Sequence, residues 1–261
     1  MAYACRATHR RLRAGFSLVA RSLIKEKRYD ASSVLTSYHH WLESDPFDCG
    51  STIHRALQGY HNQESQANGA LMRISPLAIF GVHTSLVEVA TWAKMDACLT
   101  HPHKICQEIN MLYVMALSTA IKRSIAPDQL YQQIRFWAEQ LSVDPIIIET
   151  IYLAKTENQE NFIHQQGWVI IAFHNALYQL LHAPNLEEGV VDTVMRGGDT
   201  NTNAAIVGAL LGAVYGIEVI PAQWQESVLN CRPQAGKAGV YQPRPEEYWP
   251  VDILMLAEQL L

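Results

Sequence analysis

Apolar residues recur at helical spacing along most of this chain, and no segment shows the sustained apolar–polar alternation of a half-buried strand. In residues 14–28, for example, Phe16, Val19, Leu23 and Ile24 fall on one helical face. The same pattern predicts helices over residues 31–43, 49–59, 70–80, 84–99, 103–121, 127–141, 145–155, 167–182, 186–196, 202–215, 221–229 and 250–261. The sequence therefore predicts an all-α fold.

Length and composition fit one compact domain. The chain has 261 residues, of which 49% are hydrophobic and 17% are charged, so it has enough apolar side chains for a large core. No linker rich in Pro, Gly or Ser divides it, and no internal repeat is visible.

Composition also argues against several classes of protein. A formal net charge of -5 leaves no general basic field that would attract nucleic acid. No apolar run approaches the roughly 20 residues that a transmembrane helix needs, so we expect no membrane partner. The five cysteines are scattered, odd in number and without a CxxC pair, which argues against a disulfide framework or a zinc site and favours the reducing cytoplasm.

The segment Arg196–Asn203 (Arg-Gly-Gly-Asp-Thr-Asn-Thr-Asn) carries the clearest chemical signal. Two glycines allow a sharp backbone turn, and small oxygen-bearing side chains follow at the start of an apolar helix. Asp199, Asn201 and Thr202 could direct oxygens at one point, which suits a hard cation such as Mg²⁺. The alternative is a helix cap, in which these side chains satisfy the free N–H groups of the first turn.

Three other clusters carry weaker signals, each with an ordinary structural alternative. Asn68 and Gly69 offer a tight turn whose backbone N–H groups could cradle a phosphate, or an ordinary loop before a helix. His101 and His103, separated by one proline, could bind a metal or only form hydrogen bonds within their loop. Asp48–Thr52 is a loop of small residues before a helix.

Together these clusters resemble the ADP-ribosylglycohydrolase family, and the resemblance extends from about Val19 to Leu261. It covers the order and spacing of the motifs at Asp48–Thr52, Asn68–Arg73, Thr100–His103, Gly167–Val169, Arg196–Ala205, Cys231–Pro233, Pro243–Pro245 and Trp249–Asp252. The resemblance implies an all-α orthogonal bundle around a cleft that holds two Mg²⁺ ions. Members of the family hydrolyse the N- or O-glycosidic bond that joins ADP-ribose to a protein side chain or a related acceptor.

The resemblance also implies roles for the segment around Asp199. Asp199 corresponds to a metal ligand of the catalytic centre, and Thr202 corresponds to its hydroxyl partner. The family usually has a second Asp where this chain has Asn201. Asn keeps one carbonyl ligand but removes a negative charge, so this change should weaken the second Mg²⁺ site and raise the pKa of its bound water.

Substrate contacts are implied in the other loops. The positions that resemble the family's ribose- and diphosphate-holding loops are Gly50, Thr52, Asn68 and Gly69. His101 and His103 correspond to the loop near the distal ribose. Trp168 stands where the family often has an aromatic residue that stacks on adenine, and a buried core tryptophan is the alternative.

The beginning of the sequence departs from the family pattern. The family has an acidic Thr/Ser-Asp-Asp-Ser/Thr-Glu motif near its start, whereas residues 9–16 here are basic and the first acid is Glu26. Codons can be chosen so that reading residues 9–16 one base later gives Thr-Asp-Asp-Ser-Glu. We therefore hypothesise that residues 1–17 come from a shifted reading frame and that the domain, residues 18–261, is N-terminally truncated. An organelle transit peptide, a nucleic-acid-binding arm and a solvated helix start are the alternatives.

The resemblance thus predicts a Mg²⁺-dependent ADP-ribosyl hydrolase whose partner is ADP-ribose or an ADP-ribosylated protein. Because half of the acidic metal motif is missing and position 201 is Asn, we expect at most one weak Mg²⁺ site and little or no activity. The alternative is a catalytically inactive pseudo-enzyme that binds ADP-ribose, or a decayed fragment.

Overall fold

The computed structural model describes residues 12–158 and 161–261 and confirms the predicted all-α fold. Thirteen α-helices account for most of these residues: α2 (Leu12–Glu26), α3 (Ala31–Glu43), α4 (Ser51–Leu57), α5 (Ser75–Phe80), α6 (Leu86–Cys98), α7 (Lys104–Arg123), α8 (Pro127–Gln140), α9 (Pro145–Thr156), α10 (Val169–His182), α11 (Leu186–Met195), α12 (Thr200–Tyr215), α13 (Ala222–Leu229) and α14 (Ile253–Leu260). Five short 3₁₀ turns join them: η1 (Leu71–Arg73), η2 (Gly81–His83), η3 (Ile217–Val219), η4 (Glu246–Tyr248) and η5 (Pro250–Asp252).

The predicted helix over residues 70–80 was wrong as a single element. The structure divides it into η1 and α5, with Ile74 between them. Pro76 lies in the first turn of α5, where its missing N–H costs nothing, but in a continuous helix the ring would clash with the preceding turn. Apolar periodicity survives such a break, which is why the pattern did not reveal it.

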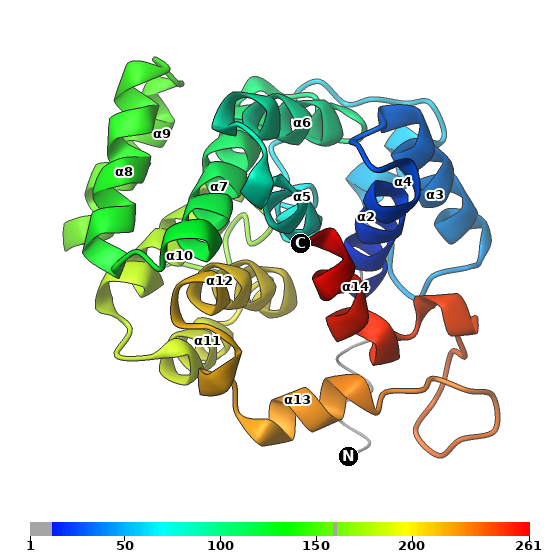
Figure 1. Ribbon diagram of the computed structural model, residues 1–261. Helices are drawn as coiled ribbons and strands as arrows, with labels where there is room; N and C mark the ends of the chain where they lie inside the picture. The colour runs from blue at the N-terminus through cyan, green and yellow to red at the C-terminus, as the bar shows by residue number, and fades with distance from the viewer. Residues whose placement is uncertain (1–11, 159–160) are drawn as a thin grey trace.

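Helix α7 forms the centre of the molecule. Ile105, Cys106 and almost every residue from Glu108 to Ala120 are buried, so this helix is covered on all sides. In Figure 1 helices α6 and α12 run across α7, and α5, α6, α8, α10 and α12 all pack against it. The α7 side chains therefore form the centre of the hydrophobic core, and the surrounding helices and loops pack on it.

The two ends of the described chain pack together. Helix α14 lies beside α2 (Figure 1), and the Arg21 guanidinium reaches Asp252 at 2.5 Å. Of the segment predicted to come from a shifted frame, residues 1–11 lie outside the described residues, and α2 begins at Leu12. None of the helices in the described ranges is long and apolar enough to cross a membrane.

A buried ion pair joins η1 to α6. The Arg73 side chain is 3% exposed and that of Asp96 is 0% exposed, with Nη2 and Oδ2 3.1 Å apart. Arg73 also donates from Nη1 to the Thr100 hydroxyl at 2.9 Å, and its guanidinium lies 4.7 Å from the centroid of the Tyr38 ring. Burial raises the pKa of Tyr38, so its phenol stays protonated and donates to Asp96 Oδ1 at 3.0 Å. This network fixes α3, η1 and α6 relative to one another.

Removing the charge of Asp96 should destabilise the whole fold. Asp96→Asn leaves the Arg73 guanidinium buried without its counter-ion, so we expect the free energy of unfolding to fall by about 3–5 kcal/mol. Urea titration followed by circular dichroism measures this loss. Asp128→Asn, an exposed carboxylate in the first turn of α8, is the matched control and should change stability by less than about 1 kcal/mol. Equal effects of the two substitutions would contradict the assigned role of the pair.

Candidate functional site

Asn68 connects two segments that are far apart in the sequence. Its buried Nδ2 lies 3.2 Å from Asp199 Oδ2 and 3.4 Å from Asn203 Oδ1. Its backbone N–H donates to the Gly167 carbonyl at 2.8 Å, and an isolated antiparallel bridge pairs Ala67 with Trp168. The structure therefore brings together the segments 66–69, 167–169 and 199–203, which carry three of the predicted motifs.

Asp199 is half-buried at the N-cap position of α12, but its side chain does not cap the helix. Only Asn68 among the described residues donates to its carboxylate, and the second oxygen, Oδ1, stays available. The cap alternative therefore does not account for the Asp199 side chain. A carboxylate held beside the first turn of a 16-residue helix also experiences the positive end of the helix dipole.

The two glycines before Asp199 both have positive φ, +80° for Gly197 and +68° for Gly198. A Cβ at Gly198 would lie only 1.9 Å from the Phe162 carbonyl oxygen, so the loop and the 161–167 segment pack backbone to backbone. Glycine is required at this position both by the conformation and by the close approach. This contact sets the direction in which Asp199 leaves the loop.

The three residues after Thr200 differ in their surroundings. Asn201 is half-buried, whereas Thr202 is 3% exposed and its hydroxyl lies 3.8 Å from Met72 Sδ. Asn203 is fully buried, and its Nδ2 has no partner although its Oδ1 accepts from Asn68. The predicted metal ligands Asp199 and Asn201 are thus partly accessible, while Thr202 would have to turn away from Met72 to reach a cation.

A cavity of about 670 Å³ opens beside these segments. Its lining residues are Glu64, Gln66, Ala67, Ile163, Gln165, Gln166, Gly167 and Trp168. Trp168 is half-buried, and its indole Nε1 donates to Gln66 Oε1 at 2.8 Å. The ring therefore packs partly against the core and partly on the wall of the cavity.

The two histidines of the Thr100–His103 loop have different surroundings in the structure. His103 Nδ1 caps α7 by accepting from the Ile105 N–H at 3.2 Å, and its Nε2 lies 3.2 Å from Gln66 Nε2. His101 is buried behind Gly69, where a Cβ would lie 3.0 Å from the imidazole. Both rings thus form hydrogen bonds or packing contacts within the protein.

Gly50 and Thr52 lie at the start of α4. Gly50, with φ +75°, lies at the N-cap position of α4 and lines a separate cleft of about 840 Å³ together with Phe47, Asp48 and His54. The Thr52 hydroxyl lies 3.0 Å from the Ser65 hydroxyl. Thr52 is therefore linked to the 65–69 segment, whereas Gly50 faces the second cleft.

Asp199 and Asn201 carry, at the start of α12, oxygen atoms of the kind that Mg²⁺ prefers. Asp199 Oδ1 and the Asn201 side chain offer oxygen ligands, and water would complete a shell of six. Across residues 12–158 and 161–261, no three His, Cys, Asp or Glu side chains gather where they could hold a metal ion.

Sequence reasoning missed the contribution of Gln66, Arg73 and Asn203 to the site. Gln66 forms hydrogen bonds with both Trp168 and His103. Arg73 donates to the hydroxyl of Thr100, the residue before His101. The Asn203 side chain accepts from the Asn68 amide, which also donates to Asp199. Arg73 and Asn203 lie within the motifs Asn68–Arg73 and Arg196–Ala205, so their positions in the sequence could have identified them as candidates. Their partners depend on loop contacts that no spacing rule predicts.

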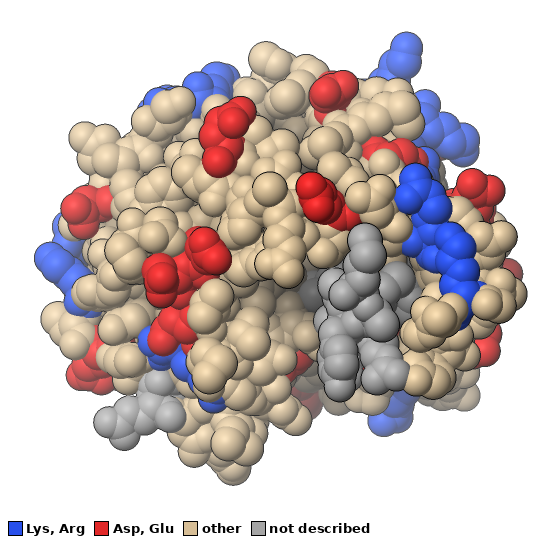
Figure 2. Space-filling model, turned by 90° about the horizontal axis from the view of Figure 1, so that it is seen from below, with Lys and Arg blue, Asp and Glu red and all other residues tan. Residues whose placement is uncertain are grey.

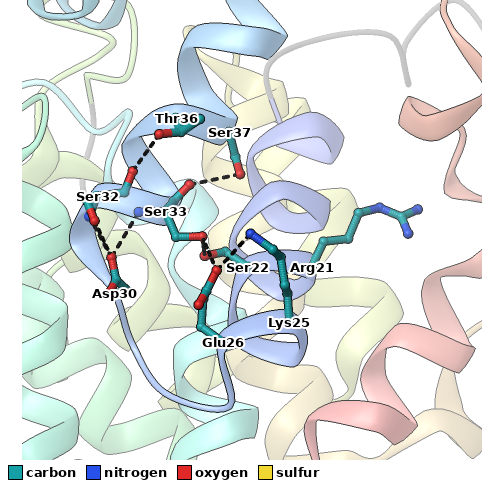
Figure 3. Close-up of a pocket in the computed structure, with 9 residues that line it drawn as sticks. All are labelled: Arg21, Ser22, Lys25, Glu26, Asp30, Ser32, Ser33, Thr36 and Ser37. Atoms are coloured by element: carbon teal, nitrogen blue, oxygen red, sulfur yellow. Dashed lines mark hydrogen bonds and ion pairs between the residues drawn. The ribbon is translucent and has the colours of Figure 1, made fainter.

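Two further features of the surface are its charge and a hollow between α2 and α3. On the face shown in Figure 2, Lys and Arg atoms and Asp and Glu atoms are both dispersed among uncharged residues. The hollow measures about 380 Å³ (Figure 3), and none of the predicted site residues lines it. In it the Ser22 hydroxyl donates to Ser33, and the Ser33 hydroxyl donates to Glu26.

The profile of the ADP-ribosylglycohydrolase family matches residues 17–249 of this chain. The chain belongs to the ADP-ribosylglycohydrolase family. It is 29% identical over 233 residues to the ADP-ribosyl glycohydrolase L543 of Acanthamoeba polyphaga mimivirus, covering 78% of this chain and 69% of that protein. It is 24% identical to the ADP-ribosylarginine hydrolase Tri1 of Pseudomonas putida, covering 80% of this chain and 59% of that protein.

Other comparisons agree on the family and on the fold. The chain is 24% identical to the ADP-ribosyl-[dinitrogen reductase] glycohydrolase of Rhodospirillum rubrum, covering 79% of this chain and 68% of that protein. It thus spans 59 to 69% of the length of these three relatives. A solved structure titled an ADP-ribosylglycohydrolase-related protein complex matches with a TM-score of 0.75 at 21% identity, covering 95% of this chain and 80% of that one. The fold of this family member is therefore the ADP-ribosylglycohydrolase fold.

Acid should destabilise this family member through His101. Burial, and secondarily the charge of Arg73, lowers the pKa of His101 to about 3, so the folded protein keeps the ring neutral. The unfolded chain binds a proton near pH 6.5, so stability should fall as the pH drops from about 6.5 towards 3, by up to about 1.4 kcal/mol per pH unit.

Urea titrations between pH 7 and pH 4 measure this effect, with His101→Gln as the comparison because Gln does not titrate. The variant should show a shallower loss of stability than the parent in that interval. Identical slopes, or an NMR titration in which the His101 ring is protonated in the folded protein near pH 6, would contradict the prediction.

Proposed function

We propose that this chain binds ADP-ribose and hydrolyses, at a low rate, the glycosidic bond that joins it to a protein side chain or a related acceptor. The observation that carries the proposal is the contact between Asn68 Nδ2 and Asp199 Oδ2 at 3.2 Å. It joins the motifs at Asn68–Arg73 and Arg196–Ala205, beside the cavity that Trp168 lines. Membership of the family supports the reaction type.

We assign substrate-binding roles to residues in and beside the cavity. The resemblance assigns the diphosphate to the Asn68–Gly69 turn, where both residues are buried and the Asn68 N–H donates to the Gly167 carbonyl. Trp168 would stack on the adenine, and Gln66 holds the indole in place through the bond to Nε1. His101 supports Gly69 from behind, and His103, bonded to Gln66, would face the distal ribose.

We further propose a single, weak Mg²⁺ site formed by Asp199, Asn201 and Thr202, with water as the remaining ligands. Bound there, Mg²⁺ would supply electrostatic activation of a water and orientation of the ribose hydroxyls. Asp199 positions this charge at the start of α12, and Asn68 fixes the carboxylate by donating to Oδ2. Asn201 contributes a neutral oxygen in place of a carboxylate, so the site binds the cation less tightly.

The impaired activity follows from the number of acids at the site. With one carboxylate, the chain has less negative charge to hold a cation and to stabilise the positive character that develops at the anomeric carbon. The single-acid donor set also favours a second candidate function, a pseudo-enzyme that binds ADP-ribose without cleaving it. The scattered cysteines favour the cytoplasm as the compartment for either function.

Two measurements on the wild-type chain distinguish these functions. Isothermal titration with ADP-ribose, with and without Mg²⁺, tests binding, and release of ADP-ribose from an ADP-ribosylated arginine peptide tests hydrolysis. Binding with Mg²⁺-dependent release supports the hydrolase. Binding without release supports the pseudo-enzyme, and the absence of both contradicts the proposal.

Restoring the second carboxylate should strengthen the metal site. Asn201→Asp adds a negative charge at a half-buried position beside Asp199, so we expect Mg²⁺ to bind on the order of tenfold more tightly, and release of ADP-ribose to accelerate with it. Asp199→Asn should remove the effect of Mg²⁺ altogether. Titration with Mg²⁺ measures both, with Asp128→Asn as the charge-matched control on exposed α8. Equal Mg²⁺ affinity of the parent and Asn201→Asp would exclude position 201 from the site.

A further inference from the structure

Arg196 lies outside the predicted site residues, yet its guanidinium touches four separate parts of the fold. Arg196 is the C-cap residue of α11 and directly precedes Gly197, Gly198 and Asp199. Its side chain is only 12% exposed. An arginine buried to this extent next to a functional loop is held by specific contacts.

Aromatic rings hold the guanidinium on two sides. Its carbon Cζ lies 5.2 Å from the centroid of the Phe162 ring and 5.2 Å from the centroid of the Tyr178 ring. Phe162 is buried and belongs to the segment 161–168, whereas Tyr178 belongs to α10. The planar guanidinium can stack on both rings while it keeps its hydrogen bonds, which the ammonium of a lysine cannot do.

Polar contacts with Asp192 and Asn158 fix the orientation of the Arg196 guanidinium. Nε lies 2.6 Å and Nη2 lies 2.5 Å from Asp192 Oδ2, one turn earlier in α11, and Nη1 donates to Asn158 Oδ1. Gln179 of α10 also donates to Asp192 Oδ2, at 2.5 Å. Charge-assisted bonds of this kind orient Arg196 more strongly than its packing alone.

These contacts hold one end of the segment 161–168, and Asn68 holds the other. At the Phe162 end, the Arg196 stack coincides with the close backbone approach of Gly198 to the Phe162 carbonyl. At the Trp168 end, the bridge to Ala67 and the Gly167–Asn68 hydrogen bond attach the segment to the site. Five residues of this segment line the cavity: Ile163, Gln165, Gln166, Gly167 and Trp168.

We infer that Arg196 is a positioning residue that sets the distance between the Trp168 wall of the cavity and the Asp199 carboxylate. The inference rests on the proposed binding of ADP-ribose at this cavity. Arg196 itself does not line the cavity, so it acts through Phe162 and the Gly197–Gly198 turn. Its role is to hold two surfaces of the site at a fixed separation before the ligand arrives, which lowers the ordering cost of binding.

Arg196→Lys tests the inference, because it keeps the charge and removes the planar double stack. We expect the affinity for ADP-ribose to fall about tenfold, with hydrogen exchange increasing at the backbone amides of residues 161–168. Arg135→Lys is the matched control: Arg135 lies 5.8 Å from the Tyr152 ring and 3.7 Å from Glu139 one turn away, on the surface of α8 and α9. The control should leave the affinity within about twofold of the parent.

Phe162→Leu removes one ring while Arg196 is retained, and it provides a second variant. If both residues act through the same stack, the double variant Phe162→Leu/Arg196→Lys should lose little more affinity than either single variant. Thermal unfolding of each variant separates this loss from general destabilisation, because the Arg135→Lys control reports an ordinary arginine-to-lysine change.

The outcomes are distinct. Increased exchange at 161–168 together with weakened binding of ADP-ribose in Arg196→Lys supports the inference. Unchanged exchange in that segment overturns it, and so does increased exchange with unchanged affinity, since the cavity would then not depend on Arg196. If the wild-type chain itself does not bind ADP-ribose, the proposed function fails, while the exchange measurement still decides whether Arg196 holds the segment.

Discussion

The guanidinium of Arg73 lies in the interior, where an unpaired charge is costly, and it therefore requires the Asp96 carboxylate and the Thr100 hydroxyl around it. The geometry of that group places η1 against α6 and the start of the loop before α7. The turn at Asn68 and Gly69 precedes η1, and His101 follows Thr100, so the same contact brings Gly69 onto the His101 ring. The position of Asn68, and with it the contact to Asp199, depends on this one buried pair.

The site that results is built from amides more than from acids. Asn68, Asn203 and Gln66 connect its segments, and Asp199 supplies the carboxylate. An amide offers both a donor and an acceptor, so it can join a carboxylate to a second amide without introducing charge repulsion. The same choice limits the negative charge available to a cation. Amide side chains around Asp199 connect the loops well, whereas strong binding of a cation would require carboxylates at the same positions.

Much of the fold could be predicted because helix formation is local. Pro127, Asp144 and Pro145, and Asn185 mark the starts of α8, α9 and α11, and apolar spacing predicts the face that each helix buries. The break at Ile74 was missed because two short elements in line keep the apolar spacing of one helix. The site could be predicted in part, since Asn68, Asp199 and Trp168 do converge. The separation of Gly50 from them, and the different surroundings of His101 and His103, could not be predicted.

The sequence by itself determined the helical class of this protein, the positions of most helix ends and its membership of the ADP-ribosylglycohydrolase family, because these depend on neighbouring residues and on motif order. The resemblance to that family also predicts a carboxylate at the position where this chain has Asn201. The tertiary structure alone decided that Asn68 donates to Asp199, that Thr202 turns towards Met72, and that Arg196 stacks between Phe162 and Tyr178. Such contacts join residues far apart in the chain, and their geometry is fixed only when close packing around α7 leaves each loop one position.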